Sequence, residues 1–347
     1  MRRLPVFFLL DCSESMAGDK LDKMQDALSA VVNSLRSNPY ALETVYVSVI
    51  AFAGVAKTIA PLTELCSFYP PKLPLGGGTC LGLAFDTLMD EMDRRVVKTT
   101  PEQKGDWKPF VFLITDGHST DKTDNAASRW QAKYAKRATL IAISLGKEAD
   151  FTLLKKLSEN VIIYEEADES RYTALIKWIS DSTISQSKSI GEGVENNPLP
   201  NLDEIALKLV KEPPASVDDS CVVLLGRCQK TKKPYLIKYE RAITKLGRGE
   251  YKVDVVNYDF TGAFTIDEEY FKWSQAKPSE IKVNTSLLNG APSCPHCSAY
   301  TAFAMCGCGK LTCTSGGEAV CPWCGKELFF GGGEGGGGDF DVGRSLG

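Results

Sequence analysis

The sequence predicts a doubly wound α/β fold with a mostly parallel sheet, followed by a smaller β-rich domain. Short apolar runs such as 5–10 and 110–114 are continuous rather than alternating, which is typical of strands buried on both faces. Segments with apolar residues at helical spacing separate these runs, and strands that alternate with helices form parallel sheets. From residue 221 onward the pattern changes to short strand candidates joined by turns.

The elements follow in a regular order through the first part of the chain. We expect strands at 5–10, 45–52, 57–62, 110–114, 139–145 and 161–164, and helices at 20–35, 81–92, 125–137, 150–157 and 170–184. In the second part we expect strands at 222–225, 234–239, 251–256 and 264–266. The short run at 57–62 is the expected edge strand.

A chain of 347 residues is too long for one typical core, so more than one domain is expected. The Ser-, Gly-, Asn- and Pro-rich stretch after the last helix is the best boundary. The predicted division is an α/β domain at 1–185, a linker at 186–202, a β-rich domain at 203–330 and a disordered Gly-rich tail at 331–347.

Composition and charge exclude several classes of protein. The net charge of −4 and pI near 5.5 argue against bulk electrostatic binding to nucleic acid or to an anionic membrane. No apolar run is long enough to span a bilayer. Arg2 and Arg3 followed by an apolar run imitate a secretion signal, but the run is too short and no small-residue cleavage site follows. We therefore expect a cytoplasmic protein.

Three polar loops of the first domain are candidates for a metal site. Asp11, Ser13 and Ser15 follow the first strand in the pattern Asp-x-Ser-x-Ser, Thr79 precedes the helix at 81–92, and Asp116 follows the strand at 110–114. In a doubly wound sheet these loops lie at the carboxyl edge of the strands. Carboxylate and hydroxyl oxygens suit a hard divalent cation.

Each loop by itself has a simpler interpretation. Asp-x-Ser-x-Ser is also ordinary turn and N-cap chemistry, and Thr-Asp-Gly is a common way to leave a strand. The Gly-rich stretch 76–81 does not match a nucleotide-binding loop, because Leu81 stands at the third glycine position. Only the three loops together, in this order on one sheet edge, favour a metal.

These five residues resemble the metal-ion-dependent adhesion site of von Willebrand factor A domains, over about residues 4–185. The resemblance implies Mg²⁺ or Mn²⁺ held by the Ser13, Ser15 and Thr79 hydroxyls, with Asp11 and Asp116 bonding directly or through water. It also implies an open coordination position for an acidic side chain of a partner protein. His118 is the only histidine of this domain, so a nucleophile–base pair is missing and we expect no enzymatic activity.

Seven of the 12 cysteines lie within residues 294–324. Two Cys-x-x-Cys pairs suggest a structural Zn²⁺ with four thiolate ligands, which are Cys294, Cys297, Cys321 and Cys324. Three further thiols and a histidine form a second Zn²⁺ site or exchange with the first set, and these are Cys306, Cys308, Cys313 and His296. One zinc ion and two remain equally compatible with the sequence.

The order of these motifs resembles the TerY family, whose C-terminal domain binds metal. That resemblance implies a bacterial protein linked with tellurite resistance or phage defence, with a PPM-type phosphatase and a protein kinase as partners. The leading hypothesis is a non-enzymatic adaptor that binds a partner's carboxylate through Mg²⁺. The alternatives are a nucleic-acid-binding zinc ribbon and a metal-dependent hydrolase. The basic stretch 227–248 is either a solvated hairpin face or a docking surface for an acidic or phosphorylated partner.

Overall fold

The computed structural model of the chain describes residues 2–146, 149–164, 169–192, 208–209, 221–246, 253–275, 281–330 and 339–344. The chain divides into two compact units. The first comprises Met1–Pro74 with Thr79–Ser216, and the second comprises Leu75–Gly78 with Val217–Gly347. Each unit has its own sheet and its own core.

The first unit is built on a sheet of seven strands. They are β1 Leu4–Asp11, β2 Val45–Phe52, β3 Ala56–Glu64, β4 Phe110–Thr115, β5 Thr139–Leu145, β6 Asn160–Tyr164 and β7 Lys208–Leu209, in the spatial order β3-β2-β1-β4-β5-β6-β7. The five strands from β2 to β6 in that order pair in parallel, and β3 and β7 pair antiparallel at the two edges. This confirms the predicted doubly wound, mostly parallel sheet.

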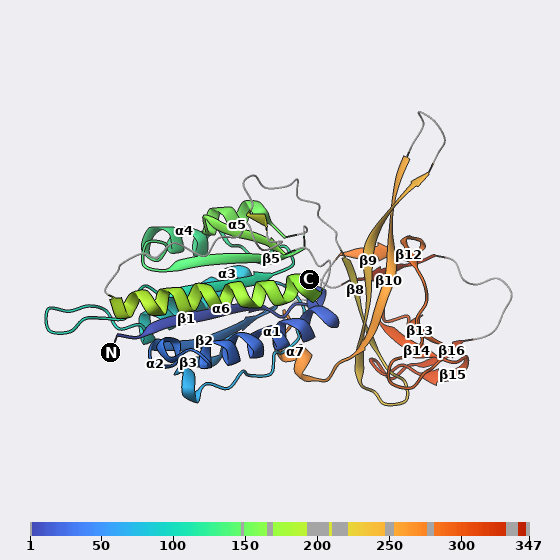
Figure 1. Cartoon of the computed structure of the whole chain (residues 1–347). Coiled ribbons are helices and arrows are strands. Elements are labelled where there is room, and N and C mark those ends of the chain that lie inside the picture. The colour runs from blue at the N-terminus through green and yellow to red at the C-terminus, as the bar shows by residue number, and fades with distance from the viewer. Residues whose placement is uncertain are drawn as a thin grey trace. The chain divides into compact units, whose positions relative to one another are not determined.

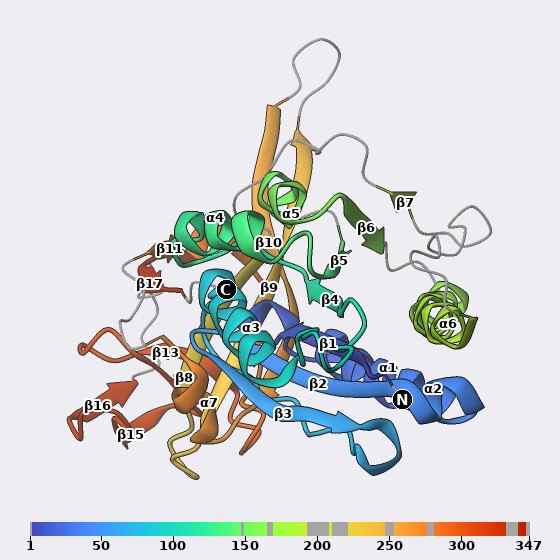
Figure 2. The same ribbon diagram turned by 90° about the vertical axis from the view of Figure 1, so that its left-hand side faces the viewer.

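Helices cover both faces of this sheet (Figure 2). They are α1 Asp19–Arg36, α2 Pro39–Thr44, α3 Leu81–Arg95, α4 Asp124–Lys133, α5 Phe151–Leu157 and α6 Glu169–Glu192, with short 3₁₀ turns η1 Glu14–Met16 and η2 Leu65–Ser67. One face carries α3, α4 and α5, and the other carries α1, α2 and α6. No helix within the described ranges is long and apolar enough to cross a membrane.

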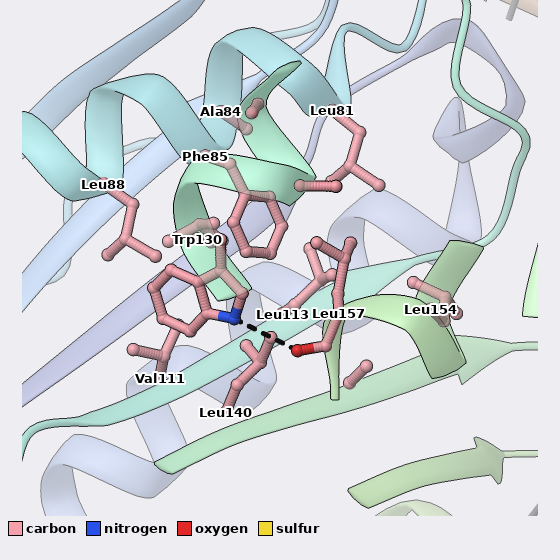
Figure 3. Packing of buried hydrophobic residues seen from close by; sticks show 14 of the residues in the cluster. Leu81, Ala84, Phe85, Leu88, Val111, Leu113, Trp130, Leu140, Leu154 and Leu157 are labelled. Carbon is pink, nitrogen blue, oxygen red and sulfur yellow. Dashed lines mark hydrogen bonds between the residues drawn. The ribbon is translucent and has the colours of Figure 1, made fainter. Parts of the chain in front are cut away.

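The continuous apolar runs are strands because both of their faces are buried. Every residue of β1 and of β4 is buried, as the runs at 5–10 and 110–114 predict. Figure 3 shows one of the two layers, in which Trp130 of α4 meets Phe85 of α3 edge-on at 5.2 Å between ring centroids. The Trp130 indole N–H is satisfied by the Leu157 carbonyl at 3.1 Å. This packing holds the loops at the strand ends in place.

The second unit is a β structure with one short helix (Figure 1). Its strands are β8 Cys221–Arg227, β9 Pro234–Leu246, β10 Val253–Thr265, β11 Lys282–Asn284, β12 Leu288–Asn289, β13 Thr301–Met305, β14 Leu311–Thr314, β15 Gly317–Val320, β16 Glu327–Phe330 and β17 Asp341–Gly343, with α7 Glu269–Trp273 and η3 Thr285–Leu287. Six of them form one sheet in the order β12-β10-β9-β8-β14-β13. The two strands expected at 251–256 and 264–266 are one long strand, β10, which pairs along β9.

The C-terminal segment differs from the expected disordered tail at 331–347. Residues 339–344 are ordered, and β17 pairs antiparallel with β11. Val342 is buried in the core of the second unit, and Phe340 packs against that core. The glycine-rich composition covers residues 331–338, whereas the apolar residues beyond it have a surface to bury. The prediction of a disordered tail was therefore wrong for 339–344.

The region between the units also differs in detail from the predicted boundaries. Helix α6 extends to Glu192 rather than ending near 184, so it covers the start of the predicted linker 186–202. Strand β7 pairs with β6 and therefore belongs to the first sheet, although residues 203–330 were assigned to the β-rich domain. Residues 193–202 of the predicted linker lie outside the described residues.

Candidate metal centres

The Asp11 loop is shaped by the end of β1. The Asp11 Oδ1 atom accepts a hydrogen bond from the Ser13 backbone N–H at 2.9 Å, which turns the chain immediately after the strand. The second carboxylate oxygen accepts from the Thr115 hydroxyl at 2.5 Å. Asp11 and Ser13 are both completely buried. The loop therefore presents its oxygen atoms in a fixed arrangement inside the protein.

A chain of hydrogen bonds connects this loop with Asp116. The Ser13 and Ser15 hydroxyl oxygens lie 2.9 Å apart, and the Ser15 hydroxyl donates to Asp116 Oδ1 at 2.7 Å. Ser15 and Asp116 are separated by 101 positions in the sequence. They meet because β1 and β4 are adjacent parallel strands whose carboxyl ends lie at the same edge.

Thr79 is held over this edge by the loop that follows β4. Its backbone N–H donates to the Thr120 hydroxyl at 2.9 Å, and its carbonyl accepts from the Thr120 N–H at 2.8 Å. The Asp121 carboxylate caps the start of α3 by accepting from the N–H groups of Gly82 and Leu83, each at 3.0 Å. Sequence reasoning missed Thr115, Thr120 and Asp121, because turn-forming residues of this kind carry no distinctive spacing.

The Thr79 side chain is the strongest sign that the site accepts a cation. Its Oγ1 atom is buried and has no hydrogen-bond partner among the described residues. An unpaired buried hydroxyl is costly, so such a group usually has a further partner. Together with the Ser13 and Ser15 hydroxyls and the two carboxylates, it would supply only oxygen ligands, which fit Mg²⁺ or Mn²⁺.

The charges of the site point in the same direction. Complete burial, followed by the neighbouring charge of Asp116, raises the pKa of Asp11 to about 7, although hydrogen bonds from Ser13 and Thr115 oppose the shift. Lys20 of α1 donates to Asp116 Oδ2 at 2.6 Å, and the Asp116 side chain is only 3% exposed. When both carboxylates are ionised, they carry more negative charge than one lysine offsets. Sequence reasoning missed Lys20, which α1 brings back to the sheet edge.

The cysteines of the second unit form two groups of four. One comprises Cys228, Cys294, Cys297 and Cys313, and the other comprises Cys306, Cys308, Cys321 and Cys324. Within each group all four sulfur atoms lie within 4.8 Å of one another. All 12 cysteines are free thiols. We call these groups the Cys228 cluster and the Cys306 cluster.

The distances in both clusters fit tetrahedral zinc. Four sulfur ligands about 2.3 Å from a central ion lie about 3.8 Å from one another. In the Cys228 cluster the Cys297 and Cys313 sulfurs are 3.7 Å apart. In the Cys306 cluster the Cys306 and Cys324 sulfurs are 3.7 Å apart, and those of Cys308 and Cys321 are 3.9 Å apart.

Similar tight turns present these cysteines, and three of them share one pattern. This pattern occurs in the turns that begin at Cys228, Cys294 and Cys321. The backbone N–H of the cysteine (residue i) donates to the carbonyl of residue i+5, and the N–H of residue i+4 donates to the carbonyl of the cysteine. Residue i+4 has a positive φ, which is 60° at Lys232 and 55° at Ser298. The turn at Cys306 is one residue shorter. Cys228 therefore begins the same kind of turn as the Cys-x-x-Cys pairs. Because its turn contains no second cysteine, the sequence shows no Cys-x-x-Cys pattern there, and Cys228 was not predicted as a ligand.

The clusters differ from the predicted ligand sets. The two Cys-x-x-Cys pairs, expected to share one ion, lie in different clusters, and Cys313 separates from Cys306 and Cys308. The physical reason is the parallel pairing of β8 with β14, in which Leu311 lies opposite Gly226 and Thr312 opposite Arg227. The next pair in this register brings Cys313 beside Cys228.

His296 lies in neither cluster. Its Nε2 atom is 2.8 Å from the Pro234 carbonyl, to which it donates. The Nε2 atom of His296 is thus used in a hydrogen bond to a strand carbonyl, and His296 does not join the second group of cysteines as a zinc ligand. Four thiols in each cluster complete a zinc coordination sphere without a histidine.

The thiols of each cluster differ in acidity. Burial raises the pKa of Cys228, but hydrogen bonds from Thr231 and Cys297 outweigh it and lower the pKa to about 6. Backbone N–H groups of Trp323 and Cys324 likewise outweigh burial and lower the pKa of Cys321 to about 7. Burial raises the pKa of Cys306 to about 12. Each cluster therefore holds one readily formed thiolate, and a bound Zn²⁺ would displace the protons of the others.

Comparison with known proteins identifies both units. Residues 6–177 match the von Willebrand factor type A domain, and residues 218–347 match the TerY-C metal binding domain. Matrilin-3 of Gallus gallus is 29% identical over 133 residues, which are 37% of this chain and 28% of matrilin-3. The chain therefore matches well under two thirds of that relative's length.

Several solved structures resemble the chain at low identity. Proximal thread matrix protein 1 from the mussel byssus is 21% identical with a TM-score of 0.40, covering 52% of this chain and 48% of its own. A further structure of that protein has a zinc-occupied MIDAS motif. A von Willebrand factor type A protein from Catenulispora acidiphila is 14% identical with a TM-score of 0.42, covering 76% and 56% respectively.

The two matched domains follow each other in the order that the motifs of the sequence suggest. The first contains the polar loops at the carboxyl edge of a doubly wound sheet, and the second contains the two cysteine clusters. The chain is thus a von Willebrand factor type A domain followed by a TerY-C metal binding domain, the architecture of the TerY-like proteins.

Proposed function

We propose that this chain is a non-enzymatic adaptor that binds an acidic side chain of a partner protein through Mg²⁺ or Mn²⁺ at the Asp11 loop. The observation that carries the proposal is the buried Thr79 hydroxyl, which has no hydrogen-bond partner among the described residues, on a loop tied by Thr120 to the segment that follows Asp116. Ser13, Ser15 and Thr79 would hold the ion together with Asp11 and Asp116. The ion would supply a Lewis-acidic charge, and these protein residues would orient it.

The charge balance supports a carboxylate as the ligand. Two aspartates and Lys20 give the site a formal charge of −1, so a divalent ion makes it +1. An incoming Glu or Asp neutralises this charge. A buried site with a residual positive charge therefore discriminates against a basic partner group.

The cysteine clusters support a structural role for the second unit. Four thiolates fill the coordination sphere of Zn²⁺ and leave no open position for a substrate. We propose two zinc ions, one in each cluster, that stabilise the β structure and position its surface. Retention of 12 free thiols suits a reducing compartment, which supports a cytoplasmic location.

For the partners, we propose a PPM-type phosphatase and a protein kinase, within a bacterial signalling module linked to tellurite resistance or phage defence. The TerY-C domain supports this part of the proposal, because the resemblance to TerY proteins implies such partners. The polar loops and the clusters support the chemistry of binding but do not identify the partner.

The test begins with metal binding to the full chain. Mn²⁺ titration followed by electron paramagnetic resonance should show one tight site that Asp116→Ala abolishes and Asp26→Ala keeps. Asp26 is an exposed residue of α1, so its substitution is a matched control.

Partner binding is measured next, with the candidate phosphatase and kinase as purified proteins. Binding should require Mg²⁺ or Mn²⁺ and should be lost in Asp116→Ala with circular dichroism unchanged. Undiminished partner affinity in a variant that no longer binds Mn²⁺ would refute the proposed mechanism.

A further inference from the structure

A cavity of about 690 Å³ lies at the opposite edge of the first sheet from the Asp11 loop. Its lining comes from the amino ends of strands, with Lys108 before β4, Thr139 at the start of β5 and Asn160 at the start of β6. The six residues of β4, at about 3.3 Å each, separate this edge from Asp116 by about 20 Å. The cavity is therefore distinct from the Asp11 loop, and no cysteine lines it.

The cavity has a marked positive charge. Four lysines line it, namely Lys108, Lys136, Lys155 and Lys156, against the single carboxylate of Glu159. Lys156 forms an exposed ion pair with Asp124 at 3.1 Å, which is a weak interaction. Lys155 donates to the Glu159 carbonyl at 3.3 Å. The lining thus has a formal charge of +3 on a chain whose net charge is −4.

Two of these lysines are not explained by a helix end or by an ion pair among the described residues. Lysines near a helix C-terminus offset the helix dipole, which accounts for Lys155 and Lys156 at the end of α5. Lys108 and Lys136 lie outside every helix and form no ion pair within the described ranges. Both residues line the same cavity.

Several uncharged donors of the lining already bond within the protein. The Trp130 N–H donates to the Leu157 carbonyl, and the Ser158 hydroxyl donates to the Leu140 carbonyl at 2.5 Å. Asn160 also donates to the Leu140 carbonyl, at 3.4 Å. Because these neutral donors bond within the protein, the four ammonium groups are the main donors left for a ligand.

We propose that this cavity binds a small anion with clustered phosphate groups, of the size of a nucleotide. Lysine is a common phosphate ligand, acting as a point charge. A volume of about 690 Å³ is much larger than one phosphate requires and lies within the range of small-molecule sites. Ala135, Ala138 and Leu140 provide an apolar part of the lining against which a non-phosphate group can pack.

The test uses calorimetry on the full chain in metal-depleted buffer without chelator, so that the Asp11 loop carries no divalent ion. Tripolyphosphate, ATP and adenosine are the probes. The phosphates of tripolyphosphate alone should bind, ATP should bind at least as tightly, and adenosine should not bind. Asp116→Ala should leave these affinities unchanged, which separates this site from the proposed metal site.

Charge reversal identifies the cavity as the site. The double variant Lys108→Glu/Lys136→Glu should weaken ATP and tripolyphosphate binding at least tenfold and reduce its salt dependence. The control Lys98→Glu/Lys133→Glu makes the same change in net charge on exposed residues outside the lining. Equal weakening in both double variants, or no binding by the unaltered chain at millimolar probe, would overturn the proposal.

A second inference concerns the two cysteine clusters and rests on the proposed zinc ions. Arg227 lies directly before Cys228, and its guanidinium group donates to the Lys232 carbonyl at 2.9 Å within the Cys228 turn. The same group stacks over the Trp323 ring of the Cys321 turn, 4.6 Å from its centroid. Trp323 in turn donates to the Leu311 carbonyl at 2.7 Å. One arginine therefore contacts a turn of each cluster.

We infer that Arg227 and Trp323 couple zinc binding at the two clusters. Zinc binding at the Cys228 cluster orders the turn whose Lys232 carbonyl accepts the Arg227 hydrogen bond. The ordered turn then holds the Arg227 guanidinium group over the Trp323 ring. The Cys306 cluster then binds zinc with part of its turn already ordered. Couplings of this kind typically change affinity between about 5-fold and 150-fold.

The coupling is measured by zinc titration of the full chain against competing chelators. Cys294→Ser disables the Cys228 cluster and should weaken zinc binding at the Cys306 cluster at least fivefold. In an Arg227→Gln or Trp323→Phe background, Cys294→Ser should weaken zinc binding at the Cys306 cluster by a smaller factor. In a Lys230→Gln background, the factor should be the same as in the unaltered chain. An equal loss in all backgrounds would mean that the fold as a whole, and not Arg227, transmits the effect, and would overturn the inference.

Discussion

Lys20 is the residue whose substitution tests the electrostatics of the Asp11 loop most directly. Its ammonium group lies 2.6 Å from Asp116 Oδ2, and its side chain is 30% exposed. A bound divalent ion competes with this ion pair for the same carboxylate. We therefore predict that Lys20→Met binds Mg²⁺ more tightly and binds an acidic partner more weakly.

The magnitude follows from the geometry of the pair. Two unit charges about 4 Å apart interact by about 1 kcal/mol in water and about 4 kcal/mol at an effective dielectric constant of 20. Because Lys20 is partly exposed, solvent screening favours the lower part of this range. A change of about 1–2 kcal/mol corresponds to Mg²⁺ affinity about 5- to 30-fold higher.

The opposite sign for the partner comes from the net charge of the loaded site. With Lys20 and a divalent ion the site has a formal charge of +1, and without Lys20 it is neutral. An acidic side chain then loses a favourable interaction. A defect in folding would weaken both interactions together, so opposite changes are diagnostic.

The assay is Mg²⁺ calorimetry at low salt, followed by partner binding at saturating Mg²⁺. Lys23→Met, at an exposed position of the same helix, is the matched control. Unchanged or weaker Mg²⁺ binding by Lys20→Met would refute the competition between lysine and metal. A gain in Mg²⁺ affinity that disappears at high salt would support it.

Three further predictions concern stability and zinc content. Burial and the charge of Asp116 raise the pKa of Asp11 from 3.8 to about 7, so the folded state holds a proton that the unfolded state releases between about pH 4 and 7. The thermal midpoint of the metal-free chain should therefore fall as the pH rises through this window, and Asp11→Asn should remove that fall. Cys228→Ser should bind one zinc ion fewer by mass spectrometry, whereas Cys221→Ser, at the start of the strand that leads to Cys228 but in neither cluster, should keep two. Val342→Asp places a charge in the core of the second unit and should lower the free energy of unfolding of that unit by several kcal/mol, seen as a lower urea midpoint, with the Asp11 loop still binding Mn²⁺. An unchanged midpoint would show that β17 does not stabilise the unit.

Much of the fold of the first unit could be predicted because short stretches of sequence specify its strands and helices. The runs at 5–10 and 110–114 are apolar on both faces, and only a strand inside a covered sheet buries both. Parallel strands place their carboxyl ends at one edge, so the order of the motifs alone indicated that Asp11, Thr79 and Asp116 would converge. The hydrogen-bond chain from Ser13 to Asp116 agrees with that inference.

The second unit shows where local information ends. Cys-x-x-Cys spacing identifies a metal-binding turn, but it does not state which turns share an ion. That choice depends on strand pairing between segments about 85 residues apart, since the register of β8 with β14 brings Cys313 beside Cys228. A lone cysteine in a tight turn has no spacing signal, so Cys228 was missed.

The sequence by itself determined the kinds of donor in this protein: oxygen atoms at one edge of the first sheet, which suit a hard cation, and thiols in tight turns, which suit zinc. The tertiary structure decided how those donors are grouped, because long-range pairing brings together residues that the sequence separates. It also placed Lys20 on Asp116 and left the Thr79 hydroxyl without a partner among the described residues. The charge and burial of a site depend on how the whole chain packs, so a short sequence motif does not predict them.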